Sequence, residues 1–271
     1  LQQLKEIRTY LHQEQEVVER VRSGIFQKLT IEGLCVKTYD EVTQNEKFYL
    51  NRFFKENIYP VIIPIAIDAT HPFPHLNNLS FGLIVKLRDS DDENIERFGL
   101  IRVPRVIDRF IELNSSTYIP IESLVAKHVE ELFPGYSLIK YAVFRVTRNA
   151  DIAIQEEEAD DFMEILEQGL KLRRKGEIVR LEVGSNADDE IINFFNHHTN
   201  VYKNDIYKFH TSLNLSSLWQ IVGNKNFAHL LSPTFQPKIL PPFDSAENMF
   251  TILDSQDVLL YHPYESFEPV V

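Results

Sequence analysis

The residues best suited to chemistry in this chain are two arginines at the end of a predicted strand. Arg145 and Arg148 lie in the segment Phe144-Arg-Val-Thr-Arg-Asn-Ala-Asp151. Guanidinium groups form charge-assisted hydrogen bonds with phosphate oxygens, so both side chains are candidates to face a polyanion. They are equally good partners for Asp151 and for the acidic run 156–158. Charge alone favours this structural ion pair over the polyanion.

Other basic residues could add to such a site. Arg102, Arg105 and Arg109 follow another predicted strand, and further positive charge lies in the range 171–175. Brought together by folding, these groups could hold a polyanion. Taken singly, each is an ordinary solvated side chain. The sequence leaves both interpretations open.

The sequence contains no motif for nucleotide, metal or nucleophile chemistry. Its nine glycines form neither G-x-G-x-x-G nor G-x-x-x-x-G-K-[ST]. The single Cys35 excludes a cysteine-based zinc site and an internal disulfide. His197 and His198 are neighbours on a predicted helix and diverge by about 100°, which makes them a poor chelate. We therefore expect no catalytic residue and no metal ligand in this chain.

Composition restricts the partners. The chain has 271 residues, of which 44% are hydrophobic and 25% charged, as in folded globular proteins. Its net charge of -12 argues against a general nucleic-acid or anionic-membrane surface. The longest apolar run, residues 61–67, contains a proline and is too short to span a bilayer. We expect a cytoplasmic protein, with membrane association of a larger complex left open.

The order of helix and strand patterns predicts an α+β fold with a mostly antiparallel sheet flanked by helices. One long helix comes first, and strand patterns dominate after it. The predicted strands are residues 61–67, 79–87, 98–103, 118–120, 138–146 and 177–183. The predicted helices are residues 1–29, 38–57, 122–133, 156–175 and 188–197.

Both ends of the chain have patterns typical of the interior of a longer protein. The first helix has an apolar stripe and is long for a compact domain, so we expect it to belong to an all-helical domain. The alternative is a surface helix of the domain that follows. At the other end, residues 258–261 predict a short strand that enters a further structural unit. The stripe consists of Leu1, Leu4, Leu11, Val18, Val21 and Ile25.

In these segments the sequence resembles bacterial polyphosphate kinase, the family that makes inorganic polyphosphate from ATP. The resemblance covers nearly the whole chain in order, although no single motif would be sufficient. The matching segments are Phe54-x5-Pro60-x3-Pro64, residues 79–87, Leu100-x2-Val103-Pro104-x4-Arg109-Phe110, Phe144 to Asp151, Arg173, residues 177–183 and Asp257-Val-Leu-Leu-Tyr-His-Pro-Tyr264.

The resemblance implies three parts. Residues 1–30 would be the last helix of an N-terminal all-helical domain, and residues 31–242 the head, or middle, domain. Residues 243–271 would begin the first phospholipase-D-like catalytic domain. The phosphorylated histidine of the family, its partner histidine and its magnesium-binding arginines are expected after Val271. The adenine-contacting asparagine is expected before Leu1, so none of these roles is assigned here.

The resemblance also implies the reaction of the longer protein, which is reversible transfer of the ATP γ-phosphoryl group through phosphohistidine to polyphosphate. ATP and Mg²⁺ belong to that protein, and no cofactor is expected in this chain. The chain is expected to be non-catalytic, to form subunit contacts of a homo-oligomer and to line part of the active site. Its partners would be the missing N-terminal and catalytic domains, ATP and polyphosphate, but no nucleic acid. The alternative is a free-standing, non-enzymatic binding or assembly module.

Overall fold

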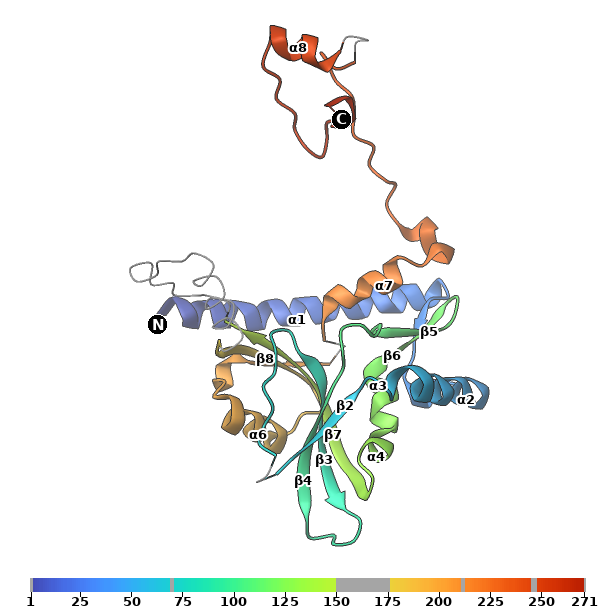
Figure 1. Ribbon diagram of the computed structural model, residues 1–271, viewed down its shortest axis with the longest axis vertical. Coiled ribbons are helices and arrows are strands. Elements are labelled where there is room, and N and C mark those ends of the chain that lie inside the picture. The colour runs from blue at the N-terminus through green and yellow to red at the C-terminus, as the bar shows by residue number, and fades with distance from the viewer. Residues whose placement is uncertain (1, 69–70, 150–175, 211–212, 245–247, 271) are drawn as a thin grey trace. The chain divides into compact units, whose positions relative to one another are not determined.

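The computed structural model of this protein describes residues 2–68, 71–149, 176–210, 213–244 and 248–270 (Figure 1). The chain divides into two compact units, Leu1–Asn226 and Phe227–Val271. The predicted helix 156–175 and the acids at Asp151 and 156–158 lie outside the described residues. The domain limits predicted at residues 30 and 242 stay predictions.

A six-stranded sheet lies at the centre of the first unit. Its strand order is β2-β4-β3-β7-β8-β9, and every neighbouring pair is antiparallel except β8 and β9. This arrangement confirms the predicted α+β fold with a mostly antiparallel sheet. The strands are β2 (Ile63–Ile67), β3 (Phe81–Asp89), β4 (Glu96–Arg102), β7 (Tyr136–Arg148), β8 (Ile178–Gly184) and β9 (Ile206–Phe209).

Helices cover both faces of this sheet, which explains why β3 is apolar almost without interruption. Leu83 and Val85 of β3 pack into one core, and Ile84 between them packs into the core on the opposite face. The first core includes residues of α2 (Gln44–Phe53), α3 (Ile121–Lys127) and α4 (Val129–Leu132). The second includes residues of α6 (Asp189–Thr199), which lies across the sheet from α3 and α4 in Figure 1.

A small second sheet lies beside the first core. It has the order β1-β6-β5, formed by β1 (Cys35–Val36), β6 (Thr117–Pro120) and β5 (Phe110–Asn114). The short helix α7 (Trp219–Val222) is attached to it, because Gln220 Oε1 accepts a hydrogen bond of 3.0 Å from the Phe110 N–H. Sequence patterns did not predict β1, β5 or β9.

The predicted helix 38–57 begins later than expected. The capping box of Thr38 and Glu41 is present, with the Thr38 N–H donating to Glu41 Oε2 at 2.7 Å, but it caps only a 3₁₀ turn. A second box of Thr43 and Glu46 starts α2, where the Thr43 N–H donates to Glu46 Oε2 at 2.7 Å. Two boxes in succession give two helix starts, and the extended backbone at Val42 separates them.

The strand predicted at residues 258–261 is wrong. These residues form no strand, and the second unit contains the helix α8 (Met249–Ser255) and an isolated bridge between Lys238 and Glu265. Local bonds explain the difference: the Tyr261 N–H donates to Glu265 Oε2 at 2.8 Å, and the Tyr264 N–H donates to Tyr261 O at 3.0 Å. The chain therefore turns where the apolar run suggested extension.

Asp188 both caps α6 and ties it to the sheet. Its Oδ1 accepts from the Ile191 N–H at 3.0 Å, and its Oδ2 accepts from Lys140 Nζ of β7. Lys140 also donates to Glu190 Oε2 at 2.6 Å. The bond from Lys140 and, second, the bond from the Ile191 N–H hold the pKa of Asp188 below its ordinary value.

We expect Asp188→Ala to lower the free energy of unfolding by about 1 kcal/mol at pH 7, the usual loss for a helix cap. Asp188→Asn should lose less, because an amide oxygen can still cap. A carboxylate with a lowered pKa in the folded state stabilises above its unfolded pKa of about 4, and this stabilisation is lost as pH falls. Urea unfolding at about pH 7 and pH 3 should show that the wild type exceeds Asp188→Asn in free energy of unfolding by less at pH 3 than at pH 7. An equal difference at both pH values would contradict this account.

Candidate functional site

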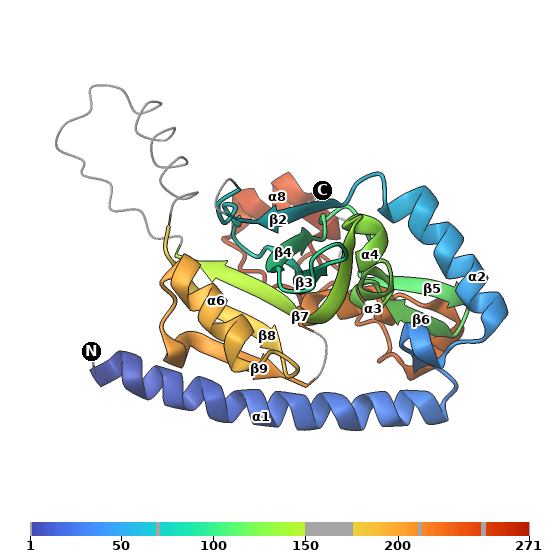
Figure 2. The ribbon, with the colours of Figure 1, turned by 90° about the horizontal axis from the view of Figure 1, so that it is seen from below.

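The long helix α1 (Gln2–Ile31) lies against the sheet through polar side chains. Figure 2 shows it running alongside β8 and β9. Arg8 donates to both carboxylate oxygens of Asp205, each at 2.6 Å, and the ring of His12 stacks on that of Tyr207 with centroids 4.4 Å apart. The first unit thus holds this part of α1 by an ion pair and stacked rings rather than by aliphatic packing.

The apolar stripe of α1 is left exposed by this arrangement. Its side chains recur every three or four positions, so they share one side of the helix. No described residue covers them fully, which suits a helix that also packs against another part of a longer protein. Exposed members, with exposures from 37% to 54%, are Leu4, Leu11, Val21 and Ile25.

Arg145 lies on the face of the sheet that α1 covers. Its Nη1 donates to Glu182 Oε2 at 3.2 Å, and its side chain is 20% exposed. Arg180 donates from Nε to the other oxygen, Glu182 Oε1, at 2.8 Å and stacks its guanidinium 3.8 Å from the centre of the Tyr207 ring. Arg145 is therefore in an ion pair, but its acid is Glu182 on the neighbouring strand; the acids that were predicted as its partners lie outside the described residues.

Arg148 lies on the opposite face, so the structure does not bring the two candidate arginines together. In the pairing of β7 with β8, Arg145 is opposite Glu182, and the register shifts between Thr147 and Arg148. After the shift Arg148 is opposite Ile178, which packs in the core on the α6 side. Successive side chains of a strand alternate between its faces, so two residues three positions apart in β7 point to opposite faces.

Arg148 is held by backbone and amide oxygens rather than by an acid. Its Nε donates to Leu76 O, its Nη1 to Gly176 O, and its backbone N–H to Asn78 Oδ1 at 2.9 Å. Burial lowers the pKa of Arg148. The guanidinium remains charged at neutral pH, and no carboxylate of the described chain neutralises it.

Arg109 is structural. Its side chain is 5% exposed and donates to both carboxylate oxygens of Glu122 at 2.7 Å. Its guanidinium lies 3.6 Å from the centre of the Phe81 ring. Arg22 of α1 lies nearby: burial, and second the like charge of Arg109, lower the pKa of Arg22. Arg109 is thus engaged inside the protein, and the predicted basic range 171–175 lies outside the described residues.

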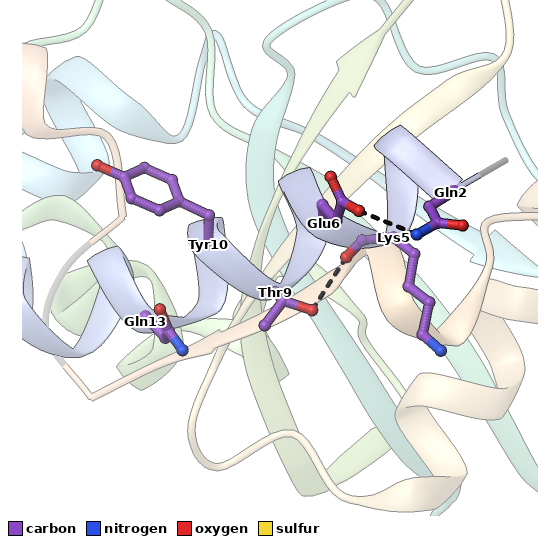
Figure 3. A pocket seen from close by; sticks show the side chains of 6 residues that line it. All are labelled: Gln2, Lys5, Glu6, Thr9, Tyr10 and Gln13. Atoms are coloured by element: carbon purple, nitrogen blue, oxygen red, sulfur yellow. Dashed lines mark hydrogen bonds between the residues drawn. The ribbon is translucent and has the colours of Figure 1, made fainter.

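A hollow of about 520 Å³ lies on α1 (Figure 3). Its polar lining is engaged within the helix itself: Gln2 Nε2 donates to Glu6 Oε1 at 3.3 Å, and Thr9 Oγ1 donates to Lys5 O at 2.9 Å. Tyr10 and Gln13 complete the wall. This set has no nucleophile next to a base, so we assign it no catalytic role.

The described ranges provide neither a metal centre nor a membrane span. Within them, no group of three or more His, Cys, Asp or Glu side chains is arranged to hold a metal ion. None of the helices that the structure describes is long and apolar enough to cross a membrane.

The comparisons with known proteins decide the family. Residues 45–221 match the family model described as the polyphosphate kinase middle domain. The chain belongs to the polyphosphate kinase family. Polyphosphate kinase from Campylobacter jejuni subsp. doylei is 55% identical over 270 residues, which cover 100% of this chain and 39% of that protein. Polyphosphate kinase from Helicobacter pylori is 37% identical over 280 residues, which cover 100% of this chain and 41% of that protein.

A solved structure shows the same fold. The crystal structure of polyphosphate kinase from Porphyromonas gingivalis superposes with a TM-score of 0.79 at 20% identity, over 98% of this chain and 39% of that one. The chain therefore spans about two fifths of the length of the polyphosphate kinases that it matches. It contains their middle domain.

Proposed function

We propose that this middle domain serves a longer polyphosphate kinase that reversibly transfers the γ-phosphoryl group of ATP, through a phosphohistidine, to the end of a polyphosphate chain. The observation that supports the proposal is the family match over residues 45–221, together with 55% identity to a polyphosphate kinase across the whole chain. ATP and Mg²⁺ would be bound by that longer protein in the cytosol. The described residues offer no metal-binding cluster, so we assign none of them to Mg²⁺.

The middle domain would act by positioning rather than by chemistry. Its α1 would present the exposed stripe, which includes Leu4 and Ile25, to an N-terminal helical domain. The polar side of α1, through Arg8 and Asp205, would hold that domain at a fixed place on the sheet. Positioning of reactants can supply a large part of the rate of a phosphoryl transfer.

Arg145 and Arg148 would face the polyanion from the two sides of β7. Arg145 shares the single carboxylate of Glu182 with Arg180, so this group of three keeps one net positive charge. Arg148 is bound by carbonyl oxygens and keeps its whole charge. Both could attract a phosphate chain although the protein as a whole has a net charge of -12.

The test is transfer of labelled γ-phosphate from ATP to polyphosphate. A longer polypeptide that includes this chain and the domains expected around it should catalyse the transfer, and the 271-residue chain alone should not. Base-stable, acid-labile phosphohistidine should form only on the longer polypeptide. Phosphohistidine on the 271-residue chain by itself would refute the non-catalytic role.

A second candidate function is assembly, favoured by large apolar side chains on the surface. Trp219 of α7 is 76% exposed and Ile31 at the end of α1 is 83% exposed, and such side chains are typical of protein interfaces. We propose that this domain forms subunit contacts in a homo-oligomer. Light scattering of the chain should then give a mass above 31.7 kDa that Trp219→Ser lowers. A monomer at all concentrations would leave only the positioning role.

A further inference from the structure

Arg102, the last residue of β4, has a guanidinium group without a partner. Its Nε is enclosed and makes no hydrogen bond, and its side chain forms no ion pair with any residue that the structure describes. An arginine donates up to five hydrogen bonds and does not lose its proton. The enclosed Nε of Arg102 has lost its hydration and no hydrogen bond replaces it, which is costly.

Three other arginines have an enclosed, unbonded nitrogen, and two of them, Arg88 and Arg109, differ from Arg102 in one respect. Arg88 pairs with Glu96 at 3.1 Å through Nη2, and Arg109 pairs with Glu122 at 2.7 Å. Their charge is therefore balanced by a carboxylate inside the protein. Arg102 has no such acid among the residues that the structure describes.

Two further arginines lie along the same stretch of chain. Arg105 donates from Nη2 to Asn78 O at 2.6 Å, and Arg148 donates its backbone N–H to Asn78 Oδ1 at 2.9 Å. Asn78 is therefore held from both sides. Leu79, the next residue, has a φ of 59°, a left-handed backbone that a leucine adopts only when the surroundings impose it.

The three arginines lie around one turn of the chain, residues 76–82. Arg102 is opposite Gly82 in the pairing of β3 with β4. Arg105 donates to Asn78 O, and the Arg148 guanidinium donates to Leu76 O. The described protein partners of Arg105 and Arg148 are neutral carbonyl or amide oxygens, so three positive charges gather at this turn without a carboxylate among their partners. Several guanidinium groups at neighbouring positions suit an anion that carries several phosphate groups.

We propose that Arg102, Arg105 and Arg148 form a binding site for a chain of linked phosphates at this end of the sheet. The proposal rests on the proposed function and deepens it, because it names the residues that hold the polyphosphate chain. Arg102 supplies Nη1 and Nη2, since its Nε is enclosed, Arg105 supplies Nε and Nη1, and Arg148 supplies Nη2. Arg145 and Arg109 are not members, because Arg145 lies on the opposite face of the sheet beside Glu182, and Arg109 is paired with Glu122.

The test is calorimetric titration of the 271-residue chain with sodium tripolyphosphate and, separately, with ATP. Tripolyphosphate should bind at least as tightly as ATP, and raising the salt from about 50 to 200 mM should weaken it strongly. Arg102→Gln should raise the dissociation constant about tenfold, as expected for loss of charge-assisted hydrogen bonds. Arg102→Lys keeps the positive charge but loses the paired N–H donors of the guanidinium. Its dissociation constant for tripolyphosphate should lie between those of the wild type and Arg102→Gln.

Matched controls separate binding from folding. Arg52→Gln changes an exposed arginine of α2 and should leave the titration unchanged. Without ligand, Arg102→Gln should melt at the same temperature as the wild type or higher, because it removes an unpaired, half-buried charge. Tripolyphosphate should raise the melting temperature of the wild type more than that of Arg102→Gln.

Equal affinity of the wild type and Arg102→Gln for tripolyphosphate would overturn the site, and so would binding of ATP without binding of tripolyphosphate. These outcomes would leave the proposed function intact, because it depends on phosphate transfer by the longer polypeptide. Conversely, a longer polypeptide unable to transfer phosphate would refute the proposed function while Arg102-dependent binding of tripolyphosphate still supported the site.

Discussion

Gly82→Ala is expected to destabilise the protein by about 3 kcal/mol or more, a large value for a single methyl group. A Cβ at this position would meet Ile101 O at a separation closer than such atoms can approach. The obstacle is backbone in the centre of the sheet, where β3 pairs with β4 and β7, so no side chain can move away to relieve the contact. Urea unfolding followed by circular dichroism measures the loss.

Gly24→Ala is the matched control. Gly24 lies within α1, and no atom outside the helix backbone lies within 4 Å of the place that its methyl group would take. Alanine should therefore stabilise the helix by up to about 1 kcal/mol. Opposite signs for the two substitutions would show that close approach, rather than glycine content, determines the result. A melting temperature of Gly82→Ala equal to that of the wild type would contradict the described pairing of β3 with β4.

Glu122→Gln is the second substitution with a large expected effect, about 3–5 kcal/mol of lost stability. The side chains of Arg109 and Glu122 are only 5% and 13% exposed, and Arg22 is buried nearby with the same charge as Arg109. Removing the negative charge would leave the Arg109 guanidinium buried without its carboxylate and close to a like charge. Denaturant unfolding at neutral pH would record the change.

The double variant Arg109→Met with Glu122→Leu tests the cause. It removes both charges together and should lower the free energy of unfolding by less than Glu122→Gln alone, because no unpaired carboxylate or guanidinium of that pair remains. Asp40→Asn breaks an exposed pair with Lys127 and should change stability by at most about 1 kcal/mol. A double variant less stable than Glu122→Gln would show that packing at this position matters more than charge.

Much of the sheet was predictable because its strands are buried on both faces. The run from Phe81 to Leu87 is apolar almost throughout, so its pattern is visible without knowledge of its neighbours. β5 and β9 were missed because they have five and four residues and contain Glu112 and Lys208, which interrupt any apolar run. Strands of this kind form only because a neighbouring strand offers hydrogen bonds.

The partners of the candidate arginines were less predictable. Arg145 is one residue from a core position, and its acid, Glu182, lies 37 residues further along the chain. That pairing depends on the register of β7 with β8. The opposite faces of Arg145 and Arg148 follow from the alternation of side chains along β7, so they could be predicted. The register of β7 with β8 is not encoded in local spacing, whereas the presence of cationic side chains at the end of the strand is.

The attachment of α1 limits how this protein can change over evolutionary time. Arg8 and Asp205 are 197 positions apart in sequence, yet each is useful only while the other is present. A sequence that loses one must replace both, so the two positions are expected to vary together among relatives. Val21 and Ile25, half-exposed on a different face of the same helix, could exchange freely with other aliphatic residues of similar volume. One helix therefore combines a side under strict pairwise constraint with a side that tolerates drift.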